Sequence, residues 1–258
     1  QSVNLGCFRV EFIKTNHSIQ DASALAIFSP VGIVLHTGDF KIDYTPVFGD
    51  PIDLQRFAEL GKKGVLAMMA DSTNATRPGF TMSERSVGKT FDAIFAEHTN
   101  HRIIVATFAS NVDRVQQVVN TAYKYGKKVV VEGRSMVTII DIASELGYIN
   151  IPDGTLIDID QLKNYPPEST VLITTGSQGE PMAGLSRMAT NNHRSISIIP
   201  GDTVIISATP IPGNEKSVGK TIDSLMRLGA HVIYERSSRI HVSGHASQEE
   251  LKLILNLV

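Results

Sequence analysis

The chain has 258 residues, 42% of them hydrophobic and 19% charged, which is the balance of a globular protein with room for one large or two modest domains. Its formal net charge of −2 excludes a general electrostatic attraction to nucleic acid, so a polyanion would need a local site. The single cysteine, Cys7, excludes an internal disulfide and a cysteine-based zinc site. The sequence shows no signal peptide and no apolar run of about 18 residues, so we expect a cytoplasmic protein without membrane contact.

The opening part of the chain, residues 1–81, reads as a series of short strands. Residues 6–14 alternate apolar and polar side chains, which is the period of a half-buried strand. Residues 30–32, Pro-Val-Gly, separate two apolar runs and predict a hairpin turn. Because the connections are short, we expect an antiparallel or mixed sheet. The expected strands are 6–14, 22–29, 33–36 and 65–70, with a short helix at 53–61.

From residue 82 onward, apolar strands alternate with helices, which predicts a doubly wound, mainly parallel sheet covered on both faces. The expected strands are 102–108, 128–132, 155–158, 171–175, 203–207 and 230–235, and the expected helices are 83–98, 111–125, 136–146, 159–164, 184–190 and 216–228. Polar, glycine-rich loops follow four of these strands, at 108–111, 132–135, 175–180 and 208–215. Such sheets bind ligands at the carboxyl ends of their strands, but surface loops are polar in general, so both interpretations stay open.

The stretch 239–246, Arg-Ile-His-Val-Ser-Gly-His-Ala, contains two histidines separated by a turn-forming Ser-Gly pair. An amphipathic helix is expected directly after it, with Ser247 as the N-cap and Glu250 completing a capping box. Imidazoles, a hydroxyl and free backbone N–H groups at a helix start suit a phosphate. The alternative is a polar turn with two surface histidines, His241 and His245.

Three further polar residues, His17, Asp39 and Asp71, stand where predicted strands give way to loops. Imidazole and carboxylate ligands suit divalent zinc or manganese. In a two-metal site a carboxylate can bridge both ions during attack on phosphorus. An imidazole oriented by a carboxylate such as Asp71 could then protonate the leaving oxygen.

Five motifs in these loops resemble the ribonuclease J family, which joins a metallo-β-lactamase domain to an inserted β-CASP domain. The resemblance implies an α/β fold, namely a partial metallo-β-lactamase αββα sandwich plus an inserted doubly wound, mainly parallel-sheet β-CASP domain. It implies a partial metallo-β-lactamase domain over 1–81, the β-CASP domain over 82–238, and a return into the first domain over 239–258. The motifs are Asn16-His17-Ser18, Thr37-Gly38-Asp39-Phe40-Lys41, Asp71-Ser72-Thr73-Asn74, Gly176-Ser177-Gln178-Gly179-Glu180-Pro181 and His241-Val242-Ser243-Gly244-His245.

The same resemblance implies a role for each matching residue and an activity for the protein. The activity is metal-dependent hydrolysis of RNA phosphodiester bonds, both 5′→3′ exonucleolytic and endonucleolytic, in RNA maturation and decay. The implied cofactors are two divalent ions, zinc or manganese, and the implied partners are RNA and further copies of the chain, as a homodimer or homotetramer, alone or with a paralogue. The implied residues are His17 and Asp39 as metal ligands, His245 and Asp71 as catalytic residues, and His241, Ser243 and Gly244 as the groups that hold the substrate phosphate.

Two departures from the family pattern concern the metal ligands. The His-x-His-x-Asp-His motif and the histidine of a Pro-Val-His-Gly-Glu-like stretch do not occur in these 258 residues. We therefore expect a truncated piece of the enzyme, in which the two-metal centre is incomplete. Two other functions stay open: a non-catalytic module that binds RNA or a partner protein, and a metallo-hydrolase of small esters. An inserted sheet of about 150 residues, far longer than an ordinary loop, argues against the small-ester enzyme.

Residues 1–258 alone are expected to show no metal-dependent RNA cleavage, because too few ligands are present to assemble two ions. Incubation of the chain with labelled RNA and Mn²⁺ or Zn²⁺ checks this, with a chelator as the control. Cleavage that the chelator abolishes would overturn the expectation.

Overall fold

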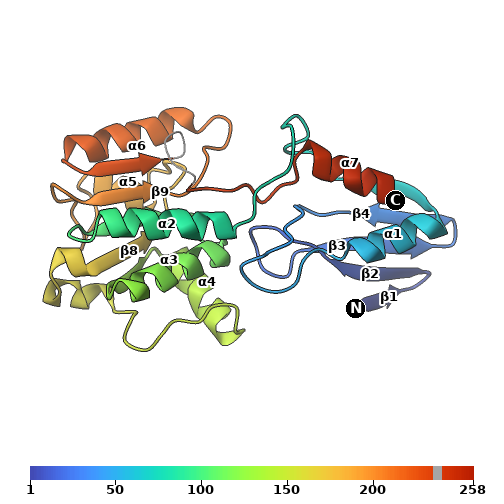
Figure 1. The fold of residues 1–258 in the computed structure, drawn as a ribbon, viewed down its shortest axis with the longest axis horizontal. Helices are drawn as coiled ribbons and strands as arrows, with labels where there is room; N and C mark the ends of the chain where they lie inside the picture. Colours follow the sequence, from blue (N-terminus) through green and yellow to red (C-terminus); the bar gives the residue numbers. More distant parts are fainter. Residues whose placement is uncertain (235–239) are drawn as a thin grey trace. The chain divides into compact units, whose positions relative to one another are not determined.

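The computed structural model describes residues 1–234 and 240–258 and divides into two compact units. The first unit consists of Gln1–Arg85 together with Val242–Val258, and the second of Ser86–His241. Figure 1 shows the helices and strands of both units as a ribbon. Glu235 at the end of the expected strand 230–235, Arg239, and the expected domain boundary between 238 and 239 lie outside the described residues.

The first unit contains a five-stranded mixed sheet in the order β1-β2-β3-β4-β5. Its strands are β1 (Ser2–Leu5), β2 (Phe8–Lys14), β3 (Ser23–Ser29), β4 (Gly32–His36) and β5 (Val65–Met69). Neighbouring strands run antiparallel except β4 and β5, which are parallel, so the predicted mixed sheet is confirmed. The expected single strand at 6–14 is wrong at its start: Gly6 takes a positive φ of 61° and turns the chain, so that β1 and β2 form a hairpin.

Two helices, α1 (Leu54–Lys63) and α7 (Gln248–Leu257), pack against each other and against this sheet. Their apolar residues, Phe57 and Leu60 of α1 and Ile254 of α7, join the core formed by the inward side chains of β2, β3 and β4. At the contact, Gly61 has no room for a side chain, because a Cβ would lie 2.0 Å from the carbonyl oxygen of Leu257. The C-terminal helix therefore completes the core that the N-terminal strands begin.

The second unit is built on five parallel strands in the order β10-β9-β6-β8-β7. Isoleucine, valine and threonine dominate these strands, and β6, β8 and β9 are buried throughout, as expected for a sheet covered on both faces. The predicted doubly wound, parallel sheet is thus confirmed. The strands are β6 (Ile103–Ala106), β7 (Lys128–Glu132), β8 (Thr170–Thr174), β9 (Thr203–Ile206) and β10 (His231–Tyr234).

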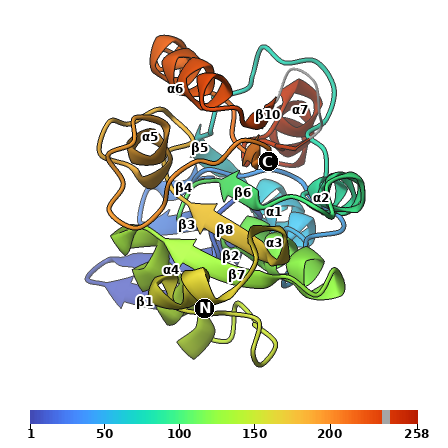
Figure 2. The same cartoon turned by 90° about the vertical axis from the view of Figure 1, so that its left-hand side faces the viewer.

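Helices cover both faces of this parallel sheet, α2 and α3 on one and α5 and α6 on the other (Figure 2). The core on the second face combines Leu185 and Met188 of α5 with Val218, Ile222 and Leu225 of α6. The expected strand at 155–158 is wrong, since only an isolated bridge between Val129 and Leu156 forms there. The helices are α2 (Arg85–Glu97), α3 (Val112–Lys124), α4 (Arg134–Glu145), α5 (Gly184–Ala189) and α6 (Glu215–Arg227), with 3-10 turns at Ile159–Asn164 and Pro167–Ser169. Among the described residues, no helix has the length and apolarity to cross a bilayer.

A buried ion pair stabilises the amino end of the parallel sheet. Arg102, just before β6, donates through Nε and Nη2 to the two carboxylate oxygens of Asp202, just before β9, at 2.9 and 2.5 Å. Asp202 also accepts the backbone N–H of Ile199, and Arg102 donates to the carbonyl of Ser197. Since both side chains are nearly inaccessible to water, each charge depends on the other for compensation.

Replacing Asp202 with Ala should therefore lower the free energy of unfolding by about 3–5 kcal/mol, because the guanidinium of Arg102 stays buried without its partner. Asp223→Ala, which removes an exposed carboxylate from α6, is the matched control and should change stability by no more than about 0.5 kcal/mol. Urea unfolding followed by circular dichroism measures both. Equal effects of the two substitutions would contradict the argument.

Candidate functional site

Four of the sequence-predicted residues meet in the first unit, at the ends of different strands. His17 follows β2, Asp39 follows β4, Asp71 follows β5, and His245 precedes α7. We call these four residues the histidine–carboxylate cluster. The two imidazole rings lie edge to face with their centroids 5.0 Å apart. Residues separated by more than 220 positions in the sequence thus form one site.

The protonation of His17 follows from its hydrogen bond. Its Nδ1 lies 2.8 Å from the carbonyl oxygen of Gly244, and since a carbonyl can only accept, Nδ1 carries the proton. The lone pair of Nε2 then faces the Asp39 carboxylate, 3.8 Å away. Burial lowers the pKa of His17, and the neighbouring His245 acts in the same direction, against the bond to Gly244 and the nearby carboxylates. A neutral imidazole held through its second nitrogen is the form that binds metal ions.

His245 is oriented by Asp71, whose Oδ2 lies 2.8 Å from its Nδ1. Burial alone would raise the pKa of Asp71, but the backbone N–H of Thr73 and the His245 ring donate to the carboxylate and hold the pKa below its ordinary value. An ionised Asp71 can only accept, so Nδ1 of His245 carries a proton and Nε2 is left for chemistry. The hydroxyl of Thr37 fixes Asp71 in turn by accepting its backbone N–H at 3.0 Å.

The cluster contains a group of donors that could hold a metal ion. One donor atom each from His17, Asp39 and His245 lie within 4.8 Å of one another. Two imidazoles and one exposed carboxylate match the ligand preferences of zinc and manganese. Among the described residues, these three donors could supply part of the coordination shell of one metal ion.

Ser243 and Gly244 shape the segment that carries His245. The hydroxyl oxygen of Ser243 accepts from Nδ2 of Asn74 at 2.8 Å and from the backbone N–H of His245 at 3.1 Å. Both lone pairs are thereby engaged, so its own proton is available for an acceptor such as a phosphate oxygen. A side chain at Gly244 would clash, since a Cβ would lie 2.7 Å from the His17 ring. Glycine at this position therefore permits the close approach of the two segments.

His241 is assigned to the second unit. It lies at the end of the second unit, where Nη1 of the fully buried Arg114 approaches its Nδ1 at 3.5 Å. The same guanidinium donates to the carbonyl and hydroxyl oxygens of Ser207 at 2.9 and 2.8 Å. The hypothesis that His241 shares the phosphate site with Ser243 and Gly244 stays a prediction.

The segment that carries His245 is held in position by three residues that the sequence analysis did not assign to the site. Asn74 and Thr81 both donate to the carbonyl of His245, at 3.2 and 2.8 Å. The buried carboxylate of Glu250 accepts the backbone N–H groups of Ile42, Thr81 and Ser247. Two sequence signals could have pointed to these residues: Asn74 lies three residues after Asp71, and Glu250 completes the capping box of α7.

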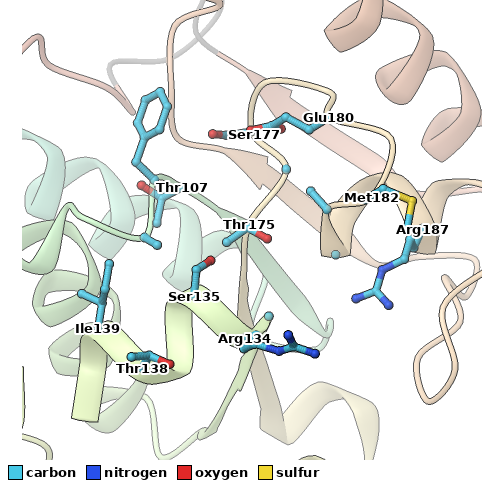
Figure 3. Close-up of a pocket in the computed structure, with 16 residues that line it drawn as sticks. Thr107, Arg134, Ser135, Thr138, Ile139, Thr175, Ser177, Glu180, Met182 and Arg187 are labelled. Carbon is cyan, nitrogen blue, oxygen red and sulfur yellow. The ribbon is translucent and has the colours of Figure 1, made fainter. Parts of the chain in front are cut away.

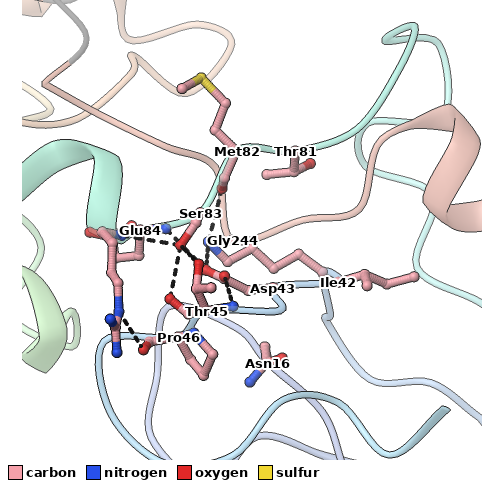
Figure 4. A network of polar contacts seen from close by, with 12 residues as sticks. Asn16, Ile42, Asp43, Thr45, Pro46, Thr81, Met82, Ser83, Glu84 and Gly244 are labelled. Atoms are coloured by element: carbon pink, nitrogen blue, oxygen red, sulfur yellow. Dashed lines mark hydrogen bonds and ion pairs between the residues drawn. The ribbon is translucent and has the colours of Figure 1, made fainter.

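A second polar network anchors the loop after β4 to the segment that leads into α2 (Figure 4). Asp43 accepts the backbone N–H groups of Glu84 and Thr45 at 3.0 Å each, and Lys41 Nζ lies 3.3 Å from its carboxylate. Burial acts to raise the pKa of Asp43, but these donors outweigh it and the pKa is lowered. The hydroxyl of Ser83 donates to the carbonyl of Thr45 at 3.0 Å. The loop that presents Asp39 is thus held by charge and backbone contacts.

The chain is similar in sequence to known ribonuclease J proteins. Residues 100–225 match the family model described as "Ribonuclease J, beta-CASP domain". Over its full length the chain is 50% identical to "Ribonuclease J" of Synechocystis sp., covering 40% of that protein. It is 49% identical to "Ribonuclease J" of Helicobacter pylori strain J99 over 99% of the chain and 37% of the relative, and 45% identical to "Ribonuclease J2" of Bacillus subtilis over 97% and 45%.

One solved structure supports the fold independently of function. The "Crystal Structure of a Protein of Unknown Function from Enterococcus faecalis V583" superposes with a TM-score of 0.69 at 18% identity, covering the whole chain and 58% of that protein. The chain spans less than half the length of the curated relatives named above. Because the similarity to ribonuclease J proteins extends over the entire chain, including the β-CASP region, the chain belongs to the ribonuclease J family.

Proposed function

We propose that this chain is part of a metal-dependent ribonuclease that hydrolyses RNA phosphodiester bonds, as a 5′→3′ exonuclease and an endonuclease in RNA maturation and decay. The observation that carries the proposal is the pairing of His245 with Asp71 beside His17 and Asp39. The first unit then corresponds to the metallo-β-lactamase domain and the second to the inserted β-CASP domain. RNA is the substrate, and self-association and a cytoplasmic location stay predictions from the sequence.

The donors present fit a divalent ion. Nε2 of His17 and the carboxylate of Asp39 are the ligands we assign to zinc or manganese, and the bond from His17 to Gly244 fixes the ring for this role. When bound, divalent ions stabilise negative charge that develops on the phosphoryl oxygens. A second ion would need ligands in addition to the three donors that lie together among the described residues.

The other residues of the cluster act on protons and on the substrate phosphate. Asp71 holds the His245 ring through Nδ1, so Nε2 can hold a proton and deliver it to the leaving oxygen of the RNA. The hydroxyl proton of Ser243 and the backbone around Gly244 are placed to bind a phosphate oxygen. In this proposal His245 and Asp71 transfer the proton, whereas Ser243 and Gly244 bind the substrate.

A ring nitrogen of His245 lies within 4.8 Å of the donor atoms of His17 and Asp39, so His245 could also serve as a metal ligand. The two roles make different demands on Nε2: a general acid must carry a proton there, whereas a ligand must not. Metal affinity and cleavage rate therefore distinguish them.

Titration of residues 1–258 with Mn²⁺ or Zn²⁺ by calorimetry tests the metal assignment. Asp39→Ala should weaken binding about 10-fold or more, because it removes the anionic donor. Asp50→Ala, which removes another exposed carboxylate of the same unit, is the control and should leave the affinity unchanged. Equal affinities of all three proteins would show that Asp39 is no ligand.

In a ribonuclease J protein that carries this segment, His245→Ala should lower kcat by about 10²–10⁴-fold while RNA affinity stays nearly constant, as expected for loss of a proton donor. Ser243→Ala should chiefly raise the Kd for RNA. Single-turnover cleavage and equilibrium binding separate the two effects. Parallel losses of rate and RNA affinity in His245→Ala would make it a binding residue, and loss of metal binding would make it a ligand.

A further inference from the structure

The parallel sheet of the second unit has a pocket at each end of its strands. One pocket, of about 970 Å³, lies at the carboxyl ends and is lined by Thr107, Ser135 and Thr175, which follow β6, β7 and β8 (Figure 3). Doubly wound sheets commonly bind ligands at this end. The other pocket, of about 530 Å³, lies at the amino ends, where Arg102 precedes β6 and Thr170 begins β8. We call it the amino-end pocket.

The amino-end pocket lies between the segments that lead into two strands of the sheet. Residues 159–167, which begin with the 3-10 turn at Ile159–Asn164, lead into β8, and residues 195–199 lead into β9. Since β6 lies between β8 and β9 in the sheet, Arg102, directly before β6, stands between the two segments. All of the lining residues belong to the second unit. Segments distant in sequence thus surround one space.

Arg102 contributes a buried guanidinium that the protein uses only in part. Its side chain is 8% exposed, and its Nε and Nη2 donate to the carboxylate of Asp202 and to the carbonyl of Ser197. Nη1 makes no hydrogen bond within the described part of the chain, although solvent still reaches it. Nitrogen donors in so buried a side chain are normally paired. Nη1 of Arg102 therefore offers two N–H groups to a ligand in the pocket that this residue lines.

Three further donor groups in the lining have no hydrogen bond or ion pair with the residues that the structure describes. They are the ammonium of Lys163 and the hydroxyls of Tyr165 and Ser195. Lys163 and Ser195 are exposed, so water satisfies them in the empty pocket, unlike the buried Nη1 of Arg102. Because they come from the two segments on either side of Arg102, these donors surround the place where an acceptor group would meet Nη1.

The rest of the lining offers an apolar surface and little net charge. Ile159 and Leu162 pack against the core of the second unit, and Ile199 in the other segment is 37% exposed. Asp160 adds a carboxylate that offsets the charge of Lys163, while the guanidinium is offset by its own ion pair. This balance favours a group with a single negative charge over a phosphate. The volume is within the range of small-molecule sites.

We propose that the amino-end pocket binds a small organic carboxylate with an apolar body. The carboxylate group accepts hydrogen bonds from Nη1 of Arg102 and from Lys163 and Ser195, and the apolar body packs against Ile159 and Leu162. An amino group on the ligand would pair with the carboxylate of Asp160, so the ligand is a plain carboxylate or an α-amino acid. The proposal is independent of the ribonuclease function, since the pocket shares no residue with the histidine–carboxylate cluster.

Calorimetry on residues 1–258 with 3-phenylpropanoate tests the proposal, and 3-phenylpropanol, which has the same apolar body without the carboxylate, is the matched ligand. The carboxylate should bind about 10-fold more tightly than the alcohol, because the alcohol lacks the charge-assisted hydrogen bonds. Lys163→Ala should weaken binding of the carboxylate about threefold, as expected for an exposed cation. Lys220→Ala, which removes an exposed lysine of α6 outside the pocket, is the control and should have no effect.

Arg102→Lys tests the buried donor, because it keeps a cation beside Asp202 but removes Nη1. Binding of 3-phenylpropanoate should weaken about 10-fold or more. A ligand that binds only the folded protein raises its melting temperature, so saturating 3-phenylpropanoate should raise it in the unsubstituted chain and much less in Arg102→Lys. If Arg102→Lys does not fold, Lys163→Ala and Ser195→Ala decide instead, since both remove exposed groups.

L-Phenylalanine distinguishes the two kinds of ligand. Binding tighter than that of 3-phenylpropanoate, with the difference removed by Asp160→Asn, identifies an α-amino acid, whereas equal or weaker binding identifies a plain carboxylate. Absence of saturable binding of both at millimolar concentrations, equal binding of the alcohol, or binding that neither Lys163→Ala nor Ser195→Ala changes overturns the proposal. Asp39→Ala should alter none of these affinities, so failure here is distinct from failure of the metal assignment.

Discussion

The buried carboxylate of Glu250 is the contact on which the first unit depends. It accepts backbone N–H groups from Ile42 in the loop after β4, Thr81 in the segment before α2, and Ser247 at the start of α7. Backbone hydrogen bonds from Ala246 to Phe40, from Gln248 to Arg77 and from Glu249 to Gly79, together with the bridge between Asn74 and Ser247, join the same parts of the chain. A fully buried carboxylate needs such donors, so Glu250 is satisfied only when these segments come together.

Hydrogen bonds within the protein hold both histidine rings of the cluster in place. His17 is held through Gly244, and His245 through Asp71, so each ring has one nitrogen committed to the protein and one left over. Lack of a side chain at Gly244 lets the two rings approach each other edge to face. The entropy lost in orienting these side chains is therefore lost during folding, which is the general basis of preorganised catalysis.

The second unit is built on a different scaffold from the first. Its parallel strands deliver every following loop to one edge, and the divergence of the connections after β6 and β8 opens a pocket there. The buried pair of Arg102 and Asp202 stabilises the opposite edge of the sheet.

The sequence by itself determined most of the local elements and which residues are candidates for the site. Alternation of apolar strands with helices predicted the parallel sheet, the capping box predicted the start of α7, and the motifs around His17, Asp39, Asp71 and His245 indicated the chemistry, because these signals depend only on near neighbours in the chain. Tertiary structure alone decided strand order, the hairpin at Gly6, the anchoring roles of Asn74, Thr81 and Glu250, and the assignment of His241 to the second unit. These features arise from contacts between residues far apart in sequence, and no local pattern of side chains specifies which distant backbone group a buried carboxylate or amide will bind.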